Sequence, residues 1–307
     1  MIPTELIERC QKIIRLGSKS FAAASLIFNA EDRAAASLLY GWCRYCDDTI
    51  DAAGTRDEAV LGEALRGLQE ATEKAFANVP QENAVFEAMR HIVVRYQIPR
   101  HYAMELLEGM AMDIRRERYE TLNDLHLYCY RVAGVVGLMM SHIMGVRSEG
   151  ALRNAADLGS AMQLTNIARD VYDDAEMGRI YLPMEWLREA GLDPSDILSP
   201  VEAPRVAGVV RRLLAEADRL YRSGDEGLRE LRFRPACAVA GARYVYAAIG
   251  SEVMRRKEYA WAVRVWIPSR KKALLLLKGV LFVLRSVPGR LARPWRPISI
   301  ATVWRFS

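Results

Sequence analysis

Apolar residues recur at intervals of three and four along most of the chain, a spacing that places them on one face of an α-helix. Stretches with this spacing cover about residues 31–52, 56–77, 83–96, 99–114, 121–145, 149–176, 203–222, 236–259 and 270–286. No segment alternates apolar and polar residues between turn signals, and the chain has no Asn-Gly or Asp-Gly pair. We therefore predict an all-α fold, with about residues 177–203 as its only conspicuous non-helical stretch.

Proline and linker residues favour a single domain. Only Pro3, Pro80 and Pro99 precede residue 183, so the first half of the chain can form uninterrupted helices. No Gly/Ser/Pro-rich segment divides the 307 residues, of which 51% are hydrophobic. A chain of this length and composition can bury a sizeable core.

Two acidic clusters lie on the polar faces of two predicted helices. Asp47 and Asp51 are four residues apart in the first cluster, and Asp170 and Asp174 are four apart in the second. Residues at this spacing share one helical face, where like charges destabilise the helix. Mg²⁺ would offset this repulsion, because it is usually held by one or two carboxylates and by phosphate oxygens of a substrate. The clusters therefore predict a site for metal ions and a diphosphate.

Other polar residues extend these acidic faces. Arg44 precedes Asp47 by three residues, and Gln163, Asn166 and Asp170 follow one another at spacings of three and four. Inward-facing polar residues on facing helices are the usual way in which an all-α fold builds a metal site. The alternative is that both clusters are solvated faces whose acidic spacing arose by chance.

The C-terminal segment differs in charge from the rest of the chain. The whole chain has 43 basic and 38 acidic residues, and ten basic but no acidic residues follow Glu258. The tail also contains the apolar run 273–284, which is interrupted by Lys278 and is too short to span a bilayer. Basic and apolar residues together with Trp295 and Trp304 favour a segment lying on an anionic membrane. The alternatives are a terminal core helix with a loose tail and, with no supporting motif, a nucleic-acid patch.

The cysteines and the N-terminus favour a reduced, cytoplasmic setting. Cys43 and Cys46 have no second pair and no His at zinc-ligand spacing, so we interpret them as small buried residues. The first ten residues include three charged side chains and no apolar signal-peptide region.

Two further segments are candidates for substrate contacts. The first, Gly17 to Phe21, places Lys19 between two hydroxyl residues ahead of a predicted helix, where free N–H groups favour phosphate, although a simple N-cap explains it equally. The second contains Gly134 and Gly137, each of which costs a helix about 1 kcal/mol. Their presence predicts that a backbone or a ligand approaches closely, and the apolar residues beyond them are candidates to line a pocket.

In combination, these motifs resemble the squalene/phytoene synthase family, most closely its bacterial phytoene-forming members. The residues that carry the resemblance are Cys43-Arg44-x-x-Asp47-Asp48-x-x-Asp51, Tyr128-Cys129-Tyr130-x-Val132-Ala133-Gly134, Gln163-Leu164-x-Asn166-Ile167-x-Arg169-Asp170, Ser18-Lys19-Ser20-Phe21, Gly178-Arg179-x-Tyr181-Leu182-Pro183 and Arg264-Val265-Trp266. The resemblance covers about residues 10 to 275. It implies a single-domain class I isoprenoid synthase helical fold with a central cavity, over residues 1–269. The basic, apolar segment 270–307 lies largely outside it.

The resemblance implies an activity and roles for individual residues. Members join two prenyl diphosphates head to head through a cyclopropyl diphosphate, with Mg²⁺ or Mn²⁺; the phytoene-forming ones use geranylgeranyl diphosphate and no NADPH, in carotenoid biosynthesis. The expected metal ligands are Asp47, Asp51, Asn166, Asp170 and Asp174. The expected catalytic residues are the same four aspartates and Tyr128. The expected substrate-binding residues are Ser18, Lys19, Phe21, Arg44, Asp113, Gln163, Asn166, Arg169, Tyr246 and Arg264.

Two alternative functions stay open at this point. One is a squalene or dehydrosqualene synthase acting on farnesyl diphosphate, and the other is a non-catalytic family member that binds isoprenoid lipid. The expected location is the cytoplasmic face of a membrane. Contact with other carotenoid-pathway enzymes is a further expectation, and a nucleic-acid partner is not expected.

Overall fold

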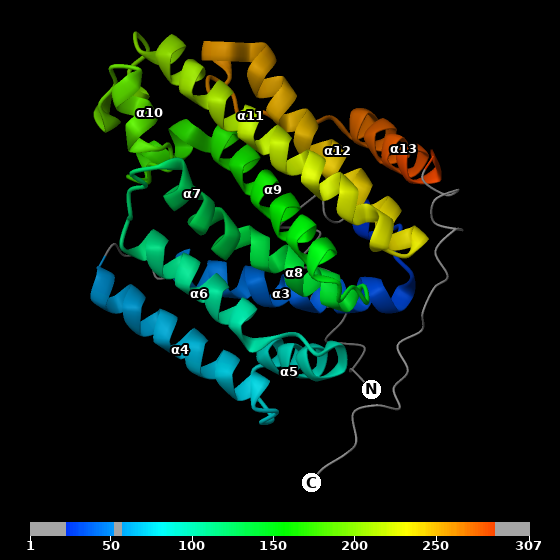
Figure 1. Cartoon of the computed structure of the whole chain (residues 1–307). Coiled ribbons are helices and arrows are strands. Elements are labelled where there is room, and N and C mark those ends of the chain that lie inside the picture. The colour runs from blue at the N-terminus through cyan, green and yellow to red at the C-terminus, as the bar shows by residue number, and fades with distance from the viewer. Residues whose placement is uncertain (1–22, 52–56, 286–307) are drawn as a thin grey trace.

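The computed structural model describes residues 23–51 and 57–285, and every regular element in these ranges is a helix (Figure 1). The α-helices are α3 (Ala30–Asp51), α4 (Glu58–Phe76), α5 (Ala84–Tyr96), α6 (Arg100–Ile114), α7 (Leu122–Cys129), α8 (Val135–Ile143), α9 (Glu149–Glu176), α10 (Met184–Glu189), α11 (Ala203–Gly227), α12 (Phe233–Arg256) and α13 (Ser269–Arg285). The all-α prediction is confirmed for the described chain. Ser18, Lys19 and Phe21 lie outside the described residues.

Two predicted stretches differ from the structure. The stretch 121–145 is not one α-helix, because a π-helical turn, η1 (Tyr130–Gly134), separates α7 from α8. The stretch 177–203 is not wholly irregular, since it contains α10 and the 3₁₀ helix η2 (Pro194–Leu198). Pro183 precedes α10 and Pro194 begins η2. Proline is tolerated there because the first residues of a helix need no N–H partner within it.

Side-chain caps fix where several helices begin. Asp57 accepts a hydrogen bond from the Ala59 N–H at the start of α4. Asn83 accepts one in the same way at the start of α5. Thr121 begins α7 with a reciprocal capping box. Each cap satisfies N–H groups that the first turn of a helix leaves without a partner.

The helices pack as two main groups, and the central helix α9 crosses the molecule beside α11 and α12 (Figure 1). One apolar cluster joins α9 to α10, α11 and α12, and it includes Leu164, Leu213 and Ile249. A second joins α3, α4, α5, α6 and α8. Helices α3 and α9 therefore belong to different clusters, and the region between them receives side chains from both.

Close packing of η1 and α8 against α9 explains two of the glycines. A Cβ atom on Gly137 would lie 2.4 Å from the carbonyl oxygen of Ala155, and one on Gly159 would lie 2.3 Å from that of Ala133. Only glycine permits backbones to approach so closely. The predicted close approach at Gly137 is confirmed, and the approaching group is the backbone of α9.

Candidate active site

An acidic cavity of about 360 Å³ lies between α3 and α9. It is lined by Arg44, Asp47, Ile50, Asp51, Met110, Asp113, Tyr128, Gln163, Asn166, Ile167, Arg169, Asp170, Asp174, Arg179 and Tyr181. Both predicted acidic clusters therefore face one space, although about 120 residues separate them along the chain. They are not two unrelated solvated faces.

Desolvation by the surrounding protein makes two of these carboxylates hard to ionise. Desolvation by the walls of the cavity, with a further contribution from the nearby Asp51 carboxylate, raises the pKa of Asp47 to about 7, although the residue keeps contact with solvent. Burial and the neighbouring Asp170 raise the pKa of Asp174 to about 7 in the same way. In both cases the protein environment disfavours the charged carboxylate, mainly by removing water and to a smaller extent through neighbouring carboxylates.

Asp170 is neutralised by two guanidinium groups instead. Arg169 donates hydrogen bonds of 2.8 and 2.5 Å to its two carboxylate oxygens. Arg264, from the segment between α12 and α13, donates two more of 2.9 Å. Burial alone would raise the pKa of Asp170, but these hydrogen bonds outweigh it and hold the pKa below its usual value. Asp47 and Asp170 each begin an acidic pair with the same spacing, but the pKa of Asp47 is raised and that of Asp170 is lowered.

The segment that carries Arg264 is held on α9 by a neighbouring indole. Trp261 donates a hydrogen bond of 3.1 Å from Nε1 to the Ala168 carbonyl oxygen. Its ring stacks on Tyr172 at a centroid distance of 5.0 Å. Both contacts keep the guanidinium group of Arg264 within reach of Asp170.

A buried tyrosine pair surrounds Asp113 at another wall of the acidic cavity. Tyr128 and Tyr181 donate hydrogen bonds of 2.9 and 2.7 Å to the two oxygens of the Asp113 carboxylate. The two rings stack with centroids 4.9 Å apart. Burial raises the pKa of Asp113 although these hydrogen bonds oppose the shift. Arg179 lies beside this group, 3.9 Å from the Asp51 carboxylate.

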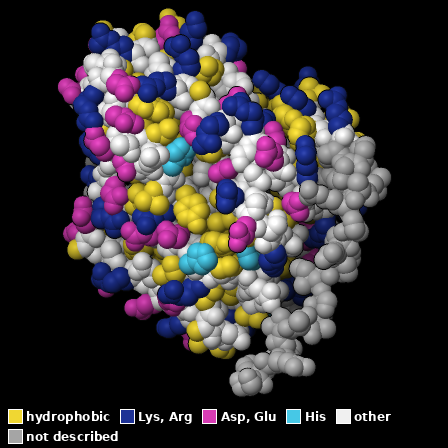
Figure 2. Space-filling model, viewed as in Figure 1, with side chains coloured by type: hydrophobic (Ala, Val, Ile, Leu, Met, Phe, Trp, Pro, Cys, Tyr) yellow, Lys and Arg dark blue, Asp and Glu magenta, His cyan; other side chains and the backbone are white. Residues whose placement is uncertain are grey.

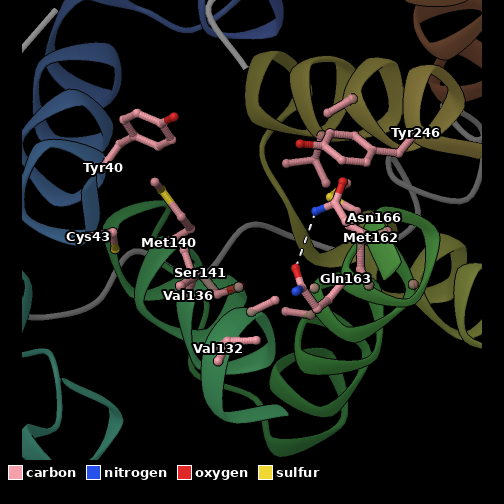
Figure 3. A pocket seen from close by; sticks show the side chains of 18 of the residues that line it. Tyr40, Cys43, Val132, Val136, Met140, Ser141, Met162, Gln163, Asn166 and Tyr246 are labelled. Atoms are coloured by element: carbon pink, nitrogen blue, oxygen red, sulfur yellow. Dashed lines mark hydrogen bonds between the residues drawn. The ribbon is translucent and has the colours of Figure 1, made fainter. Parts of the chain in front are cut away.

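A larger, mostly apolar cavity of about 730 Å³ opens from the same region. Figure 3 shows its walls: Tyr40 and Cys43 project from α3, Val136 and Met140 from α8, and Tyr246 from α12. Arg44, Asp47, Gln163, Asn166 and Arg169 line both cavities. The two cavities therefore form one site with a polar end and an apolar end.

Asn166 and Gln163 mark the boundary between the cavities. The Asn166 side chain donates a hydrogen bond of 3.2 Å from Nδ2 to Oε1 of Gln163 (Figure 3). This bond leaves the Asn166 amide oxygen available to another donor or to a cation. Arg44 lies at the same boundary, where it forms a salt bridge of 2.6 Å with the exposed Asp48.

All predicted site residues within the described ranges line one or both cavities. Tyr246 and Arg264 line the apolar cavity only, and Asp51, Asp113, Tyr128, Asp170 and Asp174 line the acidic one only. Sequence reasoning missed Tyr40, Arg179 and Tyr181 as site residues. Tyr40 lies one turn before Arg44 on the same helical face, so its position could have been found from spacing.

The donor set fits a divalent cation bound together with a diphosphate. Among the described residues, no three His, Cys, Asp or Glu side chains converge closely enough to hold an ion by themselves. Mg²⁺ usually needs only one or two carboxylates, because water and phosphate oxygens complete its octahedral shell. A bound cation would stabilise the charged forms of Asp47 and Asp174, which the protein alone disfavours.

A second surface feature lies on α13. Its exposed leucines form what we name the α13 stripe: Leu274, Leu277, Leu281 and Leu284, at 67, 54, 50 and 45% exposure. Exposed basic residues at 271, 278 and 285 flank them. Figure 2 shows this mixture of basic and apolar side chains along the edge of the molecule where α13 lies. The opposite face of α13 packs on α12, and Val283 on that face is fully buried. In the described ranges, no helix has the length and apolarity needed to cross a membrane.

Comparison with known proteins gives a consistent result. Residues 14–271 match the family described as squalene/phytoene synthase. A 15-cis-phytoene synthase of Pantoea ananas is 40% identical over 304 residues, which cover 95% of this chain and 98% of that protein. A 15-cis-phytoene synthase of Enterobacter agglomerans is 42% identical over 285 residues, covering 91% and 96%.

Solved structures show the same architecture. A dehydrosqualene synthase in complex with a ligand superimposes with a TM-score of 0.83 at 26% identity, covering 92% of this chain and 97% of that one. A squalene synthase of Alicyclobacillus acidocaldarius gives a TM-score of 0.75 at 26% identity, covering 84% and 97%. The predicted isoprenoid synthase fold is confirmed.

Proposed function

Because the chain belongs to the squalene/phytoene synthase family, we propose that it is a phytoene synthase that joins two molecules of geranylgeranyl diphosphate head to head. The reaction releases two diphosphates and passes through a cyclopropyl diphosphate. Near-full-length similarity to phytoene synthases at about 40% identity supports this branch of the family. The single structural observation that carries the proposal is the union of an acidic cavity with an apolar one.

The polar end matches the diphosphate of such a substrate. Arg44, Arg169 and Arg179 line the acidic cavity. Arginine forks match phosphate oxygens in a bidentate geometry. We assign these residues to diphosphate binding, together with Arg264, which would exchange its bonds to Asp170 for bonds to the substrate. Ser18 and Lys19 stay predictions as additional diphosphate contacts.

The carboxylates would act through a divalent metal. We assign Asp47, Asp51, Asp170 and Asp174, with Asn166, to holding Mg²⁺ or Mn²⁺. When bound, the metal supplies positive charge where the leaving diphosphate develops negative charge. Before substrate binds, Arg169 and Arg264 hold Asp170 in the ionised form that such a role requires; the metal would then take over this stabilisation from Arg264.

The apolar end would protect a carbocation from water. Departure of the diphosphate leaves an allylic cation that must react with an alkene. Tyr246 and Tyr40 face this part of the cavity from opposite walls (Figure 3). Aromatic faces attract cations. We assign the same role to Tyr128, which lines the acidic cavity, where departure of the diphosphate would create the cation. Phe21 stays a prediction.

Product analysis tests the proposal. Purified protein is incubated with geranylgeranyl diphosphate and Mg²⁺, and the hydrocarbon is identified by mass spectrometry. We expect phytoene without added NADPH and no product after exhaustive chelation. A C30 hydrocarbon formed only from farnesyl diphosphate would instead assign the chain to the squalene or dehydrosqualene branch. No turnover with either substrate would favour a lipid-binding role.

We further propose that residues 270–307 attach the protein to an anionic membrane surface, as expected for an enzyme whose substrate and product carry long apolar chains. The α13 stripe and its flanking basic residues support this proposal. Each basic residue close to an anionic leaflet contributes about 1 kcal/mol. Such lipids face the cytoplasm, so we assign the protein to that side. Contact with other pathway enzymes stays a prediction.

Vesicle flotation tests the attachment. The triple variant Leu274→Gln, Leu277→Gln, Leu281→Gln should float poorly with vesicles containing anionic lipid. The matched control changes three exposed apolar residues away from α13, Val94, Leu127 and Val201, to Gln. High salt should weaken flotation of the wild type, because exposed charges are screened beyond about 10 Å at 0.1 M. Equal flotation of both triple variants would exclude the stripe as the anchor.

A further inference from the structure

We propose that the far end of the apolar cavity, at Ala151, Met144 and Val146, sets the longest prenyl chain that the enzyme accepts. This inference rests on the proposed function, since it concerns the substrate of that same site. It adds a determinant of specificity at the end of the cavity that is remote from the diphosphate.

Helix α9 gives the apolar cavity its direction. Asn166 lines the cavity where it meets the acidic one, and Ala151 lines it near the start of α9. Fifteen residues separate them, or about 22 Å along a helix that rises 1.5 Å per residue. A chain whose diphosphate lies at the polar end therefore extends along α9, and its last isoprene unit lies nearest Ala151.

The far end is closed by a packed apolar cluster. Met144, Val146, Leu228 and Leu231 line this end of the cavity and belong to one buried cluster with Ala151. None of the five is more than 8% exposed. Side chains packed to this degree have little space into which they can move. This end of the cavity therefore resists extension by a longer ligand.

Ala151 is the position at which added volume acts on the chain end alone. It has the smallest side chain of the five, and it is the only one of the five on α9. A larger side chain would take the space of the terminal isoprene unit and leave the region near Asn166 unchanged. Loss of room for a single methylene changes discrimination by about 10- to 200-fold. Loss of room for part of an isoprene unit should act at least as strongly.

The test compares chain lengths in one assay. We expect Ala151→Leu to lower the ratio of kcat/KM for geranylgeranyl diphosphate to kcat/KM for farnesyl diphosphate by at least about tenfold. The control is Arg153→Leu, which places the same side chain on the same helical turn at an exposed position that does not line the cavity. It should leave the ratio unchanged.

A second variant tests the same end in the opposite direction. Met144→Ala removes volume from the wall, so turnover of the C25 diphosphate should rise relative to that of the C20 diphosphate. Thermal unfolding with Mg²⁺ present establishes which variants are folded. The inference is overturned if folded Ala151→Leu keeps the wild-type ratio for the C20 and C15 diphosphates. It is also overturned if folded Met144→Ala keeps the wild-type ratio for the C25 and C20 diphosphates. Failure of the proposed function is a separate result, because it appears as absence of turnover of the C20 diphosphate by the wild type.

Discussion

Asp47 and Asp170 each open a pair of acidic residues on one helical face, but their surroundings differ. Desolvation by the cavity walls raises the pKa of Asp47, whereas hydrogen bonds from Arg169 and Arg264 outweigh burial and lower the pKa of Asp170. A raised carboxylate pKa means that the folded protein disfavours the charged form, and a lowered one means that it favours it. The two residues should therefore respond differently to neutralisation.

We expect Asp47→Asn and Asp170→Asn each to abolish turnover but to shift stability in opposite directions. Without metal at pH 8, Asp47→Asn should leave the free energy of unfolding unchanged or raise it. Asp170→Asn should lower it by about 1–3 kcal/mol, because charge-assisted hydrogen bonds are lost. Urea unfolding in the presence of a chelator measures both. Asp218→Asn, an exposed position on α11, is the control for loss of one charge. Equal shifts in both site variants would contradict the electrostatic difference.

The sequence predicted most of the residues that line the two cavities, and the limits of that prediction are physical. Periodicity placed Asp47 with Asp51 and Gln163 with Asn166, since helical spacing alone decides which side chains share a face. It could not show that Arg264, 94 residues away, pairs with Asp170. Arg179 and Tyr181 were missed because they follow the end of α9, where Gly178 adopts a φ of +80° and redirects the chain.

At the scale of the element, helix bounds were predictable where caps and apolar spacing agree. The spacing predicted 149–176 for the helix that the structure places at Glu149–Glu176. The π-helical turn at Tyr130–Gly134 left no signal in the spacing. Such a turn changes the phase of a helix by one residue, and only packing against a neighbouring helix reveals it. Gly134 and Gly137 were the remaining sign of that packing.

The contact between η1 and α9 gives a stability prediction. Gly159→Ala should lower the free energy of unfolding by about 1–3 kcal/mol, because the new methyl group would overlap the Ala133 carbonyl oxygen. Gly208→Ala on α11 is the matched control, since a Cβ there meets no atom within 4 Å. It should raise stability by up to about 1 kcal/mol through helix propensity. Differential scanning calorimetry compares the two, and a stabilising Gly159→Ala would refute the close approach.

Helix α5 gives a prediction about pH. Arg90 donates two hydrogen bonds to the Glu87 carboxylate and lowers its pKa to about 2. A lowered pKa stabilises the folded state above the unfolded value of about 4.3, and this contribution is lost as the pH falls towards 2. Glu87→Gln should therefore cost about 1 kcal/mol at pH 7, since solvent weakens a pair so near the surface. The difference from the wild type should shrink below pH 4.5 in urea titrations, and a constant difference would contradict the assignment.

At the scale of the whole molecule, the acidic cavity joins two apolar clusters. Asp47 belongs to a helix of one cluster, and Asp174 to a helix of the other. A ligand that contacts both helices should stabilise the molecule as a unit. We expect Mg²⁺ with inorganic diphosphate to raise the melting temperature, with a gain of about 2.7 kcal/mol when the ligand is at 100 times its Kd. The gain should be largely lost in Asp47→Asn. Mg²⁺ with sulfate at equal ionic strength controls for general salt effects, and an equal gain there would exclude a diphosphate site.

The position of the site between the two clusters also has a consequence in time. The helices of each apolar cluster can pack together early in folding, but the acidic cavity forms only when the two clusters dock. Docking brings the carboxylates of Asp47, Asp51, Asp170 and Asp174 into one space. Contacts between residues this distant in sequence form slowly in folding. Refolding followed from denaturant should therefore restore the helical circular dichroism signal before it restores turnover. Mg²⁺ should shorten the interval, because it removes the repulsion that opposes the last step.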